Sequence, residues 1–455
     1  MSGSESGLTR HVTARTATAL VIANVIGAGV FTTTGFQAAD LGNPYLILFL
    51  WALGGFLAWC GAMCFAELGA AMPAAGAEYV YLRETYGRAF GFTSAFVSLF
   101  AGFSAPIAAA VKSLIFYLSA WFPVLSDDNV IAFGISFNDL ASIFIVWALV
   151  IIHMRGRKGA FAFNDLVTLL KVGGIVLIIL AAAAVGDGNL GNFSYVADRY
   201  YEMDQSAIFS ALATSLIFVM FCYSGWNAAA YIASEIIEPQ RNLPKALLSG
   251  TLIVTVLYLL LNAVYIYGAN VDELAGKVEV GLVASMNLFG SFGSSLVTAV
   301  LTVSLLASAS AMTIAGPRVY YALGQDIGKF RALCETNAAD APVNALLLQG
   351  IVATAIILTG SVDQILSYAG FTLALMSALA VSCVIVLRIK RPEMPRPFKV
   401  FAYPLTPLIF IIVSVWTMFW AFQGRPLESI LALLTVAAGG GIFTVAYLLK
   451  RSRAG

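Results

Sequence analysis

The sequence predicts an all-α integral membrane protein with about twelve transmembrane helices. Hydrophobic residues make up 60% of the 455 residues and charged residues only 11%, with a mean hydropathy of +0.88. This composition excludes a soluble globular chain. Apolar stretches of about 20 residues, the length that crosses a bilayer as a helix, follow one another along the chain. Alternating segments of about 10 residues, typical of a membrane β-barrel, do not occur in the sequence, so the fold class is helical.

The predicted spans are read from the positions of these apolar stretches. They cover residues 16–39, 44–70, 88–121, 136–154, 162–186, 207–236, 245–269, 294–324, 343–360, 364–390, 402–422 and 428–449. Basic residues gather in alternate loops, for example at Arg155, Arg157 and Lys158, whereas the other loops carry mostly acids. Because Lys and Arg are enriched in cytoplasmic loops, we expect a multi-pass protein of the cell membrane with both termini in the cytoplasm.

Two of the predicted spans are interrupted by short glycine-containing peptides. The first span carries Gly27-Ala28-Gly29-Val30-Phe31, and the sixth carries Tyr223-Ser224-Gly225-Trp226-Asn227. An unpaired backbone group in hydrocarbon is costly, so non-helical backbone at this depth is tolerated only where it faces a cavity or a ligand. Interruptions at matching places in two halves of a chain indicate a substrate site near the bilayer midplane. Close helix packing at glycine is the alternative interpretation.

The spacing of the two interruptions predicts a five-plus-five inverted repeat, in which the broken helices meet antiparallel at the centre. The predicted division of the chain is a cytoplasmic segment 1–15, a first repeat 16–186 (helices 1–5), a second repeat 207–390 (helices 6–10), a linker 391–401, helices 11 and 12 over 402–449, and a cytoplasmic tail 450–455. The prolines of the linker exclude a helix there. Residues 272–293 are expected to form short helices that cap the outer face.

The broken helices have a defined binding chemistry. A helix that stops and restarts leaves amide donors at one end and carbonyl acceptors at the other, each with about half an elementary charge. We expect the amides around Gly29 to hold a carboxylate, and carbonyls near Val25, Phe221 and Ser224 to hold an ammonium. The expected substrate-binding residues are Val25, Gly27, Ala28, Gly29, Val30, Phe221, Ser224, Gly225 and Asn227. The predicted ligand is therefore a small zwitterion.

These segments resemble the amino acid, polyamine and organocation transporter superfamily, close to its L-type amino acid transporter branch. The resemblance covers nearly the whole chain. It is carried by Gly27 through Phe31, by Pro73, Gly76, Glu78, Tyr79, Tyr81 and Leu82, by Phe221 through Asn227, and by Glu235, Pro239, Arg241, Asn242, Leu243 and Pro244. It implies an alternating-access transporter in which the substrate carboxylate meets the amides of Ala28 and Gly29 and the Phe221 ring is the outer gate.

The same resemblance implies supporting residues and a substrate size. It places Tyr258 and Asn262 near the substrate amine, with ordinary interhelical hydrogen bonding as the alternative role. Ser224 stands where glycine is frequent in transporters of large side chains, so we expect small to medium neutral amino acids as substrates.

Lys171 lies well inside the fifth span, where a lysine costs about 2.5–3.5 kcal/mol on insertion scales. We expect its ammonium to take the carbonyl bonds that a bound sodium ion would otherwise receive. A second cation about 4 Å away would be repelled by roughly 4 kcal/mol at an effective dielectric of 20, so sodium coupling is disfavoured. The resemblance supports this role, because sodium-independent members of the branch carry a lysine there. Snorkelling is the alternative for Lys171 and the expected behaviour of Lys112 in the third span.

The remaining composition disfavours other function classes. The chain has two histidines and five cysteines, with no midplane acid pair, metal-ligand spacing or P-loop, so we expect no enzyme, no metal and no cofactor. A net charge of +1 argues against a nucleic-acid partner. The expected partners are an amino acid and the lipid bilayer, with protein partners left open.

The expected function is sodium-independent secondary transport of neutral L-amino acids, as an exchanger. The alternatives are a proton-coupled symporter, an exporter, a polyamine or decarboxylation-product antiporter, and a nutrient sensor with a transporter fold.

Overall fold

The computed structural model describes residues 10, 12–74, 76–126, 129–132, 134–155, 157–326, 328–337 and 341–452. Most of the predicted N-terminal segment and the end of the predicted tail lie outside these residues. The fold is all-α, as predicted. Within the described residues, nine helices are long and apolar enough to cross a membrane, and Ala14–Val25 and Val343–Thr359 are shorter apolar helices. The count of twelve crossings and the two-fold relation between the halves stay predictions.

The helices follow the twelve predicted ranges closely. The first part of the chain forms α1 (Ala14–Val25), α2 (Thr33–Leu41), α3 (Pro44–Ala71), α4 (Glu78–Tyr86), α5 (Arg88–Val97), α6 (Ala105–Ser119), α7 (Phe137–Met154), α8 (Arg157–Val185) and α9 (Asp198–Tyr201). The second part forms α10 (Gln205–Tyr223), α11 (Ala228–Tyr231), α12 (Pro239–Gly268), α13 (Val271–Leu274), α14 (Val280–Asp326), α15 (Val343–Thr359), α16 (Val362–Lys390), α17 (Leu405–Gly424) and α18 (Pro426–Ser452). A two-stranded antiparallel hairpin, β1 (Val130–Ala132) and β2 (Ile135–Ser136), precedes α7.

Local capping explains several helix starts. The Asn43 side chain accepts hydrogen bonds from the amides of Tyr45 and Leu46, and Pro44 occupies the first position of α3, where its missing donor costs nothing. At α7, Ser136 and Asp139 form a reciprocal capping box. These polar residues between apolar stretches fix where the spans begin.

Two interruptions of regular helix have identifiable causes. Residues Ser98–Ser104, between α5 and α6, form a π-helical segment directly before Pro106, whose ring cannot accept the usual backbone geometry of an α-helix interior. In α14, Gly290 has φ 68° and ψ −170°, a conformation that is open to glycine. It separates a short outer helix over 280–289 from the membrane span. Together with α13, this outer helix confirms the short helices predicted within 272–293.

The linker 391–401 is non-helical, as predicted, and it is held to the helices by Glu67 at the end of the second span. The buried Glu67 carboxylate accepts hydrogen bonds from Arg388 Nε at 2.9 Å and from the Val400 amide at 2.7 Å. Arg396 lies 3.4 Å away from the same carboxylate. These two arginines give the buried acid the positive charge that it requires.

The expectation for Lys112 is wrong. Its side chain is 4% exposed, and its ammonium forms an ion pair with Asp139 of α7 instead of reaching toward the membrane surface. A buried charge requires a partner of opposite sign, and the capping carboxylate at the start of α7 supplies it. The sequence alone does not show that α6 and α7 pack together and place Asp139 beside Lys112.

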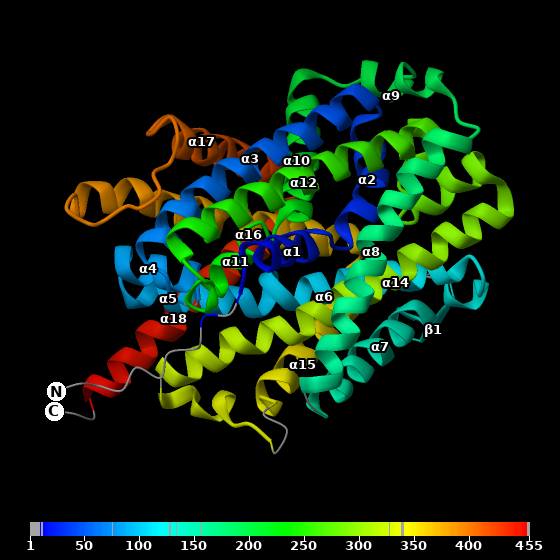
Figure 1. The fold of residues 1–455 in the computed structure, drawn as a ribbon. Coiled ribbons are helices and arrows are strands. Elements are labelled where there is room, and N and C mark those ends of the chain that lie inside the picture. The colour runs from blue at the N-terminus through cyan, green and yellow to red at the C-terminus, as the bar shows by residue number, and fades with distance from the viewer. Residues whose placement is uncertain are drawn as a thin grey trace.

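The broken first span lies inside the molecule. Figure 1 shows α1, in dark blue, near the centre of the drawing with the longer helices around it. Its residues Ala17, Val21 and Val25 are buried. The elements around this centre position the candidate site.

Candidate functional site

The first and sixth spans are broken where the sequence predicts. Helix α1 ends at Val25, a single 3-10 turn covers Gly29–Phe31, and α2 begins at Thr33. Helix α10 ends at Tyr223, and a turn over residues 224–227 leads into the short α11. Residues 25–31 and 224–227 are hereafter called the first and second break.

The two breaks lie against each other. Gly225 has φ +105°, and a β-carbon there would lie 3.0 Å from the carbonyl carbon and oxygen of Asn24. A β-carbon on Gly29 would lie 2.4 Å from Cys222 Sγ. Real β-carbons essentially never lie as close as the 2.4 Å found at Gly29. At Gly225 the positive φ favours glycine, and the space beside it is tight. The predicted juxtaposition of the two interruptions is thus present in the structure.

The first break contains buried backbone amides that have no hydrogen-bond acceptor in the described chain. Ala28, Gly29 and Val30 are all buried. Within the described chain, the hydrogen bonds at this turn run from the Phe31 amide to the Ala28 carbonyl and from the Thr32 amide to the Gly29 carbonyl, and none uses the amides of residues 28–30. Buried amides without an acceptor are rare in folded proteins. These three lie at the N-terminal end of the second helical half, where a negative charge is favoured.

The carbonyls of the breaks are partly occupied in this conformation. The Tyr258 hydroxyl lies 2.7 Å from the Val25 carbonyl oxygen and 3.2 Å from that of Cys222. The Phe221 carbonyl accepts the Ser224 amide at 2.9 Å. Tyr258 of α12 therefore bridges the ends of α1 and α10.

Asn262 connects the same network to the other half of the first span. Its side-chain oxygen accepts a hydrogen bond from Thr34 of α2, and its amide nitrogen donates to the Tyr258 carbonyl at 2.8 Å. Helix α12 is thus bonded to both halves of the broken helix. The structure brings both predicted supporting residues to the breaks, as interhelical hydrogen-bonding groups.

Lys171 of α8 reaches the end of α1. Its side chain is 1% exposed, and its ammonium donates to the carbonyls of Ala23 at 2.9 Å and Ile26 at 2.6 Å. Ser308 of α14 lies 3.4 Å from the ammonium and 3.3 Å from the Ile26 carbonyl. The lysine is not snorkelling: it satisfies carbonyls that the break at Ile26 leaves without helical partners.

One side of the breaks is covered by α9 and by the segment around α13, whose individual contacts with α2 are not visible in the sequence. The Gly276 amide, between α13 and α14, donates to the Gly35 carbonyl of α2 at 2.9 Å. Arg199 of α9 donates to the Ala38 carbonyl at 2.6 Å and pairs with Asp272 of α13. Phe221, which the resemblance implies to be a gate, is 6% exposed, and its gating role stays a prediction.

Glu78, the first residue of α4, covers the second break and α11 on another side. Its Oε1 accepts a hydrogen bond from Asn227 Nδ2 at 3.0 Å, and its Oε2 lies 3.5 Å from the Tyr231 hydroxyl. Burial raises the pKa of this carboxyl to about 7. Asn227, which the sequence predicts to bind substrate, thus contacts Glu78 at the start of α4. In the sequence, Glu78 is visible only as the acid of the Gly76–Leu82 pattern, which gives it no role in contacting the second break.

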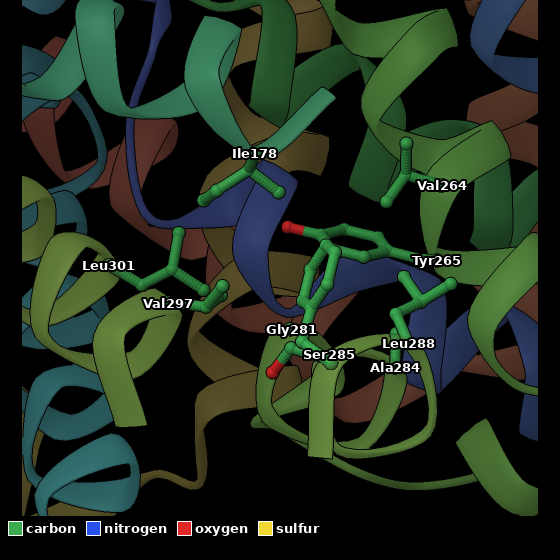
Figure 2. Close-up of a pocket in the computed structure, with 10 residues that line it drawn as sticks. Ile178, Val264, Tyr265, Gly281, Ala284, Ser285, Leu288, Val297 and Leu301 are labelled. Atoms are coloured by element: carbon green, nitrogen blue, oxygen red, sulfur yellow. The ribbon is translucent and has the colours of Figure 1, made fainter. Parts of the chain in front are cut away.

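A small cavity lies between α8, α12 and α14, and none of the residues that line it belongs to either break. Figure 2 shows the Tyr265 hydroxyl pointing into it, near Ile178 and Leu301. The cavity volume is about 10 Å³, which is at the lower limit for one water molecule. An amino acid does not fit there, so this cavity is not the substrate site.

Comparisons with known proteins identify the family that this chain resembles along its length. Residues 13–442 match the family described as amino acid permease. The serine/threonine exchanger SteT of Bacillus subtilis is 28% identical over 459 aligned positions, which cover 100% of both chains. The human b(0,+)-type amino acid transporter 1 is 26% identical over 92% of this chain and 84% of its own. The human large neutral amino acids transporter small subunit 2 is 25% identical over 92% of this chain and 76% of its own.

Proposed function

The chain belongs to the amino acid permease family, and we propose that it is a sodium-independent exchanger of small to medium neutral L-amino acids. It works by alternating access in the cell membrane with both termini in the cytoplasm. The family is one of multi-pass membrane permeases and not of enzymes.

The observation that carries the proposal is the row of unpaired, buried amides at Ala28, Gly29 and Val30. A carboxylate bound there accepts two or three charge-assisted hydrogen bonds and meets the positive end of α2. The Ser224 carbonyl, which accepts no backbone bond in the described chain, lies on the second break and receives the ammonium. The ammonium competes with Tyr258 for the Val25 carbonyl. One α-amino acid backbone thus satisfies both breaks.

Sodium independence follows from Lys171. Its ammonium occupies the carbonyls of Ala23 and Ile26, and carbonyl oxygens are the ligands that sodium would need. A sodium ion at the same place would meet a fixed positive charge at a few ångströms, which is strongly unfavourable in a buried site.

Substrate size and exchange mode have separate support. Cys222 Sγ lies close to Gly29, and Thr33 is 3.2 Å from the same sulfur, so side chains already fill the space beside the break. Ser224 narrows the second break further. The printed name of one relative is a serine/threonine exchanger, and serine and threonine are in the size class that this space favours.

The test uses purified protein in liposomes. Uptake of a panel of labelled amino acids is measured with and without unlabelled amino acid inside, in sodium buffer and in choline buffer. The proposal predicts uptake of small neutral amino acids that requires internal substrate and is equal in both buffers. Sodium-dependent uptake, or arginine or tryptophan as the best substrate, would contradict it.

A further inference from the structure

Glu78 is a buried carboxyl group without a cationic partner. The residue is 7% exposed. In the described chain, its two carboxyl oxygens contact only the neutral donors Asn227 and Tyr231. Two other buried acids in the described chain have cationic partners: Glu67 pairs with arginines, and Asp139 pairs with Lys112. No ion pair of Glu78 occurs among the residues that the structure describes.

Among the residues that the structure describes, no positively charged side chain contacts the Glu78 carboxyl group. The titratable groups that face it are Tyr231 of α11, Tyr81 of its own helix and Cys383 of α16. All three are neutral at physiological pH, and losing a proton from any of them would add a second negative charge. An isolated buried carboxylate is costly, so proton binding is the simplest way to remove the cost.

The contacts of Glu78 lie on the segment that must move. Asn227 is the last residue of the second break and Tyr231 is the last residue of α11. The same loop holds α11 a second time, because the Gly76 amide donates to the Tyr231 carbonyl at 3.2 Å. An inner path from the breaks to the cytoplasm can open only if α4 and its loop separate from α11.

We propose that Glu78 is a proton-binding site of the inner gate, and that the bound proton favours the closed gate. The neutral acid accepts the Asn227 amide at one oxygen, and its own O–H can donate to the Tyr231 oxygen, so both contacts persist without a buried charge. The carboxylate keeps the same two contacts but buries a negative charge among neutral groups. After proton loss the gate opens more readily, because the charge then reaches water.

The sign and size follow from proton linkage. Burial raises the pKa of Glu78 from 4.5 to about 7 in the closed gate, and exposure on opening returns it toward the ordinary value. Protonation therefore stabilises the closed gate fully below about pH 4.5, and this effect is lost as the pH rises through about 7. Between pH 6 and pH 8 the ratio of closed to open gate falls about tenfold.

The experiment measures amino acid exchange in liposomes with equal substrate and equal pH on both sides, from pH 6 to pH 8. Its transport readout rests on the proposed function. Exchange by the unmodified protein should rise several-fold over this range. Glu78→Gln, which is neutral at every pH, should remove the rise. The matched control Glu84→Gln changes a half-buried acid on the same helix that pairs with Arg83 and Arg391, and it should keep the rise.

A second variant and a second readout keep the inference testable. Tyr231→Phe removes a hydrogen-bond donor that lowers the pKa of Glu78. The pKa should therefore rise in this variant, and the midpoint of the increase in exchange should move to higher pH. Difference infrared spectra of purified protein between pH 6 and pH 8 should contain a carboxylic acid C=O band that Glu78→Gln lacks, whether or not the chain transports the tested amino acid. A flat profile in the unmodified protein, the same rise in Glu78→Gln, or identical spectra in both proteins would overturn the inference. A complete lack of exchange with the infrared band present would contradict the proposed function alone.

Discussion

Replacing Lys171 with methionine tests how the end of the first helix is held. Methionine keeps most of the apolar stem but removes the ammonium, so the carbonyls of Ala23 and Ile26 lose their donor. A buried acceptor left without a partner costs about 1–3 kcal/mol. Even the lower value for two carbonyls, about 2 kcal/mol, corresponds to about a 30-fold change in an equilibrium.

We therefore expect Lys171→Met to lower exchange at least about 30-fold, because the first break loses the geometry that binds substrate. The assay is the initial exchange rate and the KM in liposomes that contain equal amounts of monodisperse protein. Lys112→Met is the matched control: it also removes a buried ammonium, but one that pairs with Asp139 and bonds neither break in the described chain. That variant should lower thermal stability and leave the KM unchanged. Exchange by Lys171→Met within twofold of the unmodified protein would refute the reasoning.

Three further variants test the packing of the site and its surroundings. Gly29→Ala should abolish exchange in the liposome uptake assay, because the added methyl group would lie 2.4 Å from Cys222 Sγ. The control Gly173→Ala should retain exchange, because its methyl group would meet no atom within 4 Å. Ser224→Gly should widen the second break, so uptake of larger neutral amino acids should rise relative to serine in competition assays; an unchanged ranking would contradict the assigned position. Glu67→Ala should lower the unfolding temperature in detergent strongly, since breaking a buried ion pair costs about 3–5 kcal/mol, and a shift no larger than that of Glu84→Ala would argue against the role of Glu67.

The sequence predicts the helices and both breaks because their signals are local. A run of apolar residues long enough to cross a bilayer defines each span, and glycine with polar or aromatic neighbours marks Gly27–Phe31 and Tyr223–Asn227. The depth of Lys171 in its span is equally visible. Its partners are consistent with the prediction because a buried ammonium near a helix break has few acceptors other than the carbonyls that the break leaves free.

Contacts between distant segments could not be predicted in the same way. Lys112 looks like a snorkelling residue until α7 brings Asp139 beside it. Arg199 and Glu78 lie in connecting segments whose position depends on the packing of helices far away in sequence. Tyr258 was expected near the substrate amine, but its bonds to the carbonyls of Val25 and Cys222 depend on how α12 lies across both breaks. These features are set by tertiary packing, which residue type alone does not encode.

The most direct test of the central claim is competition by substrate analogues that lack one charge. Labelled serine exchange in liposomes is measured with unlabelled serine, serinamide or N-acetylserine as competitor. If the amides of residues 28–30 bind the carboxylate and the carbonyls of the breaks bind the ammonium, serine competes and both analogues fail. Equal competition by serinamide, which has no carboxylate, or by N-acetylserine, which has no ammonium, would show that the breaks do not bind a zwitterion.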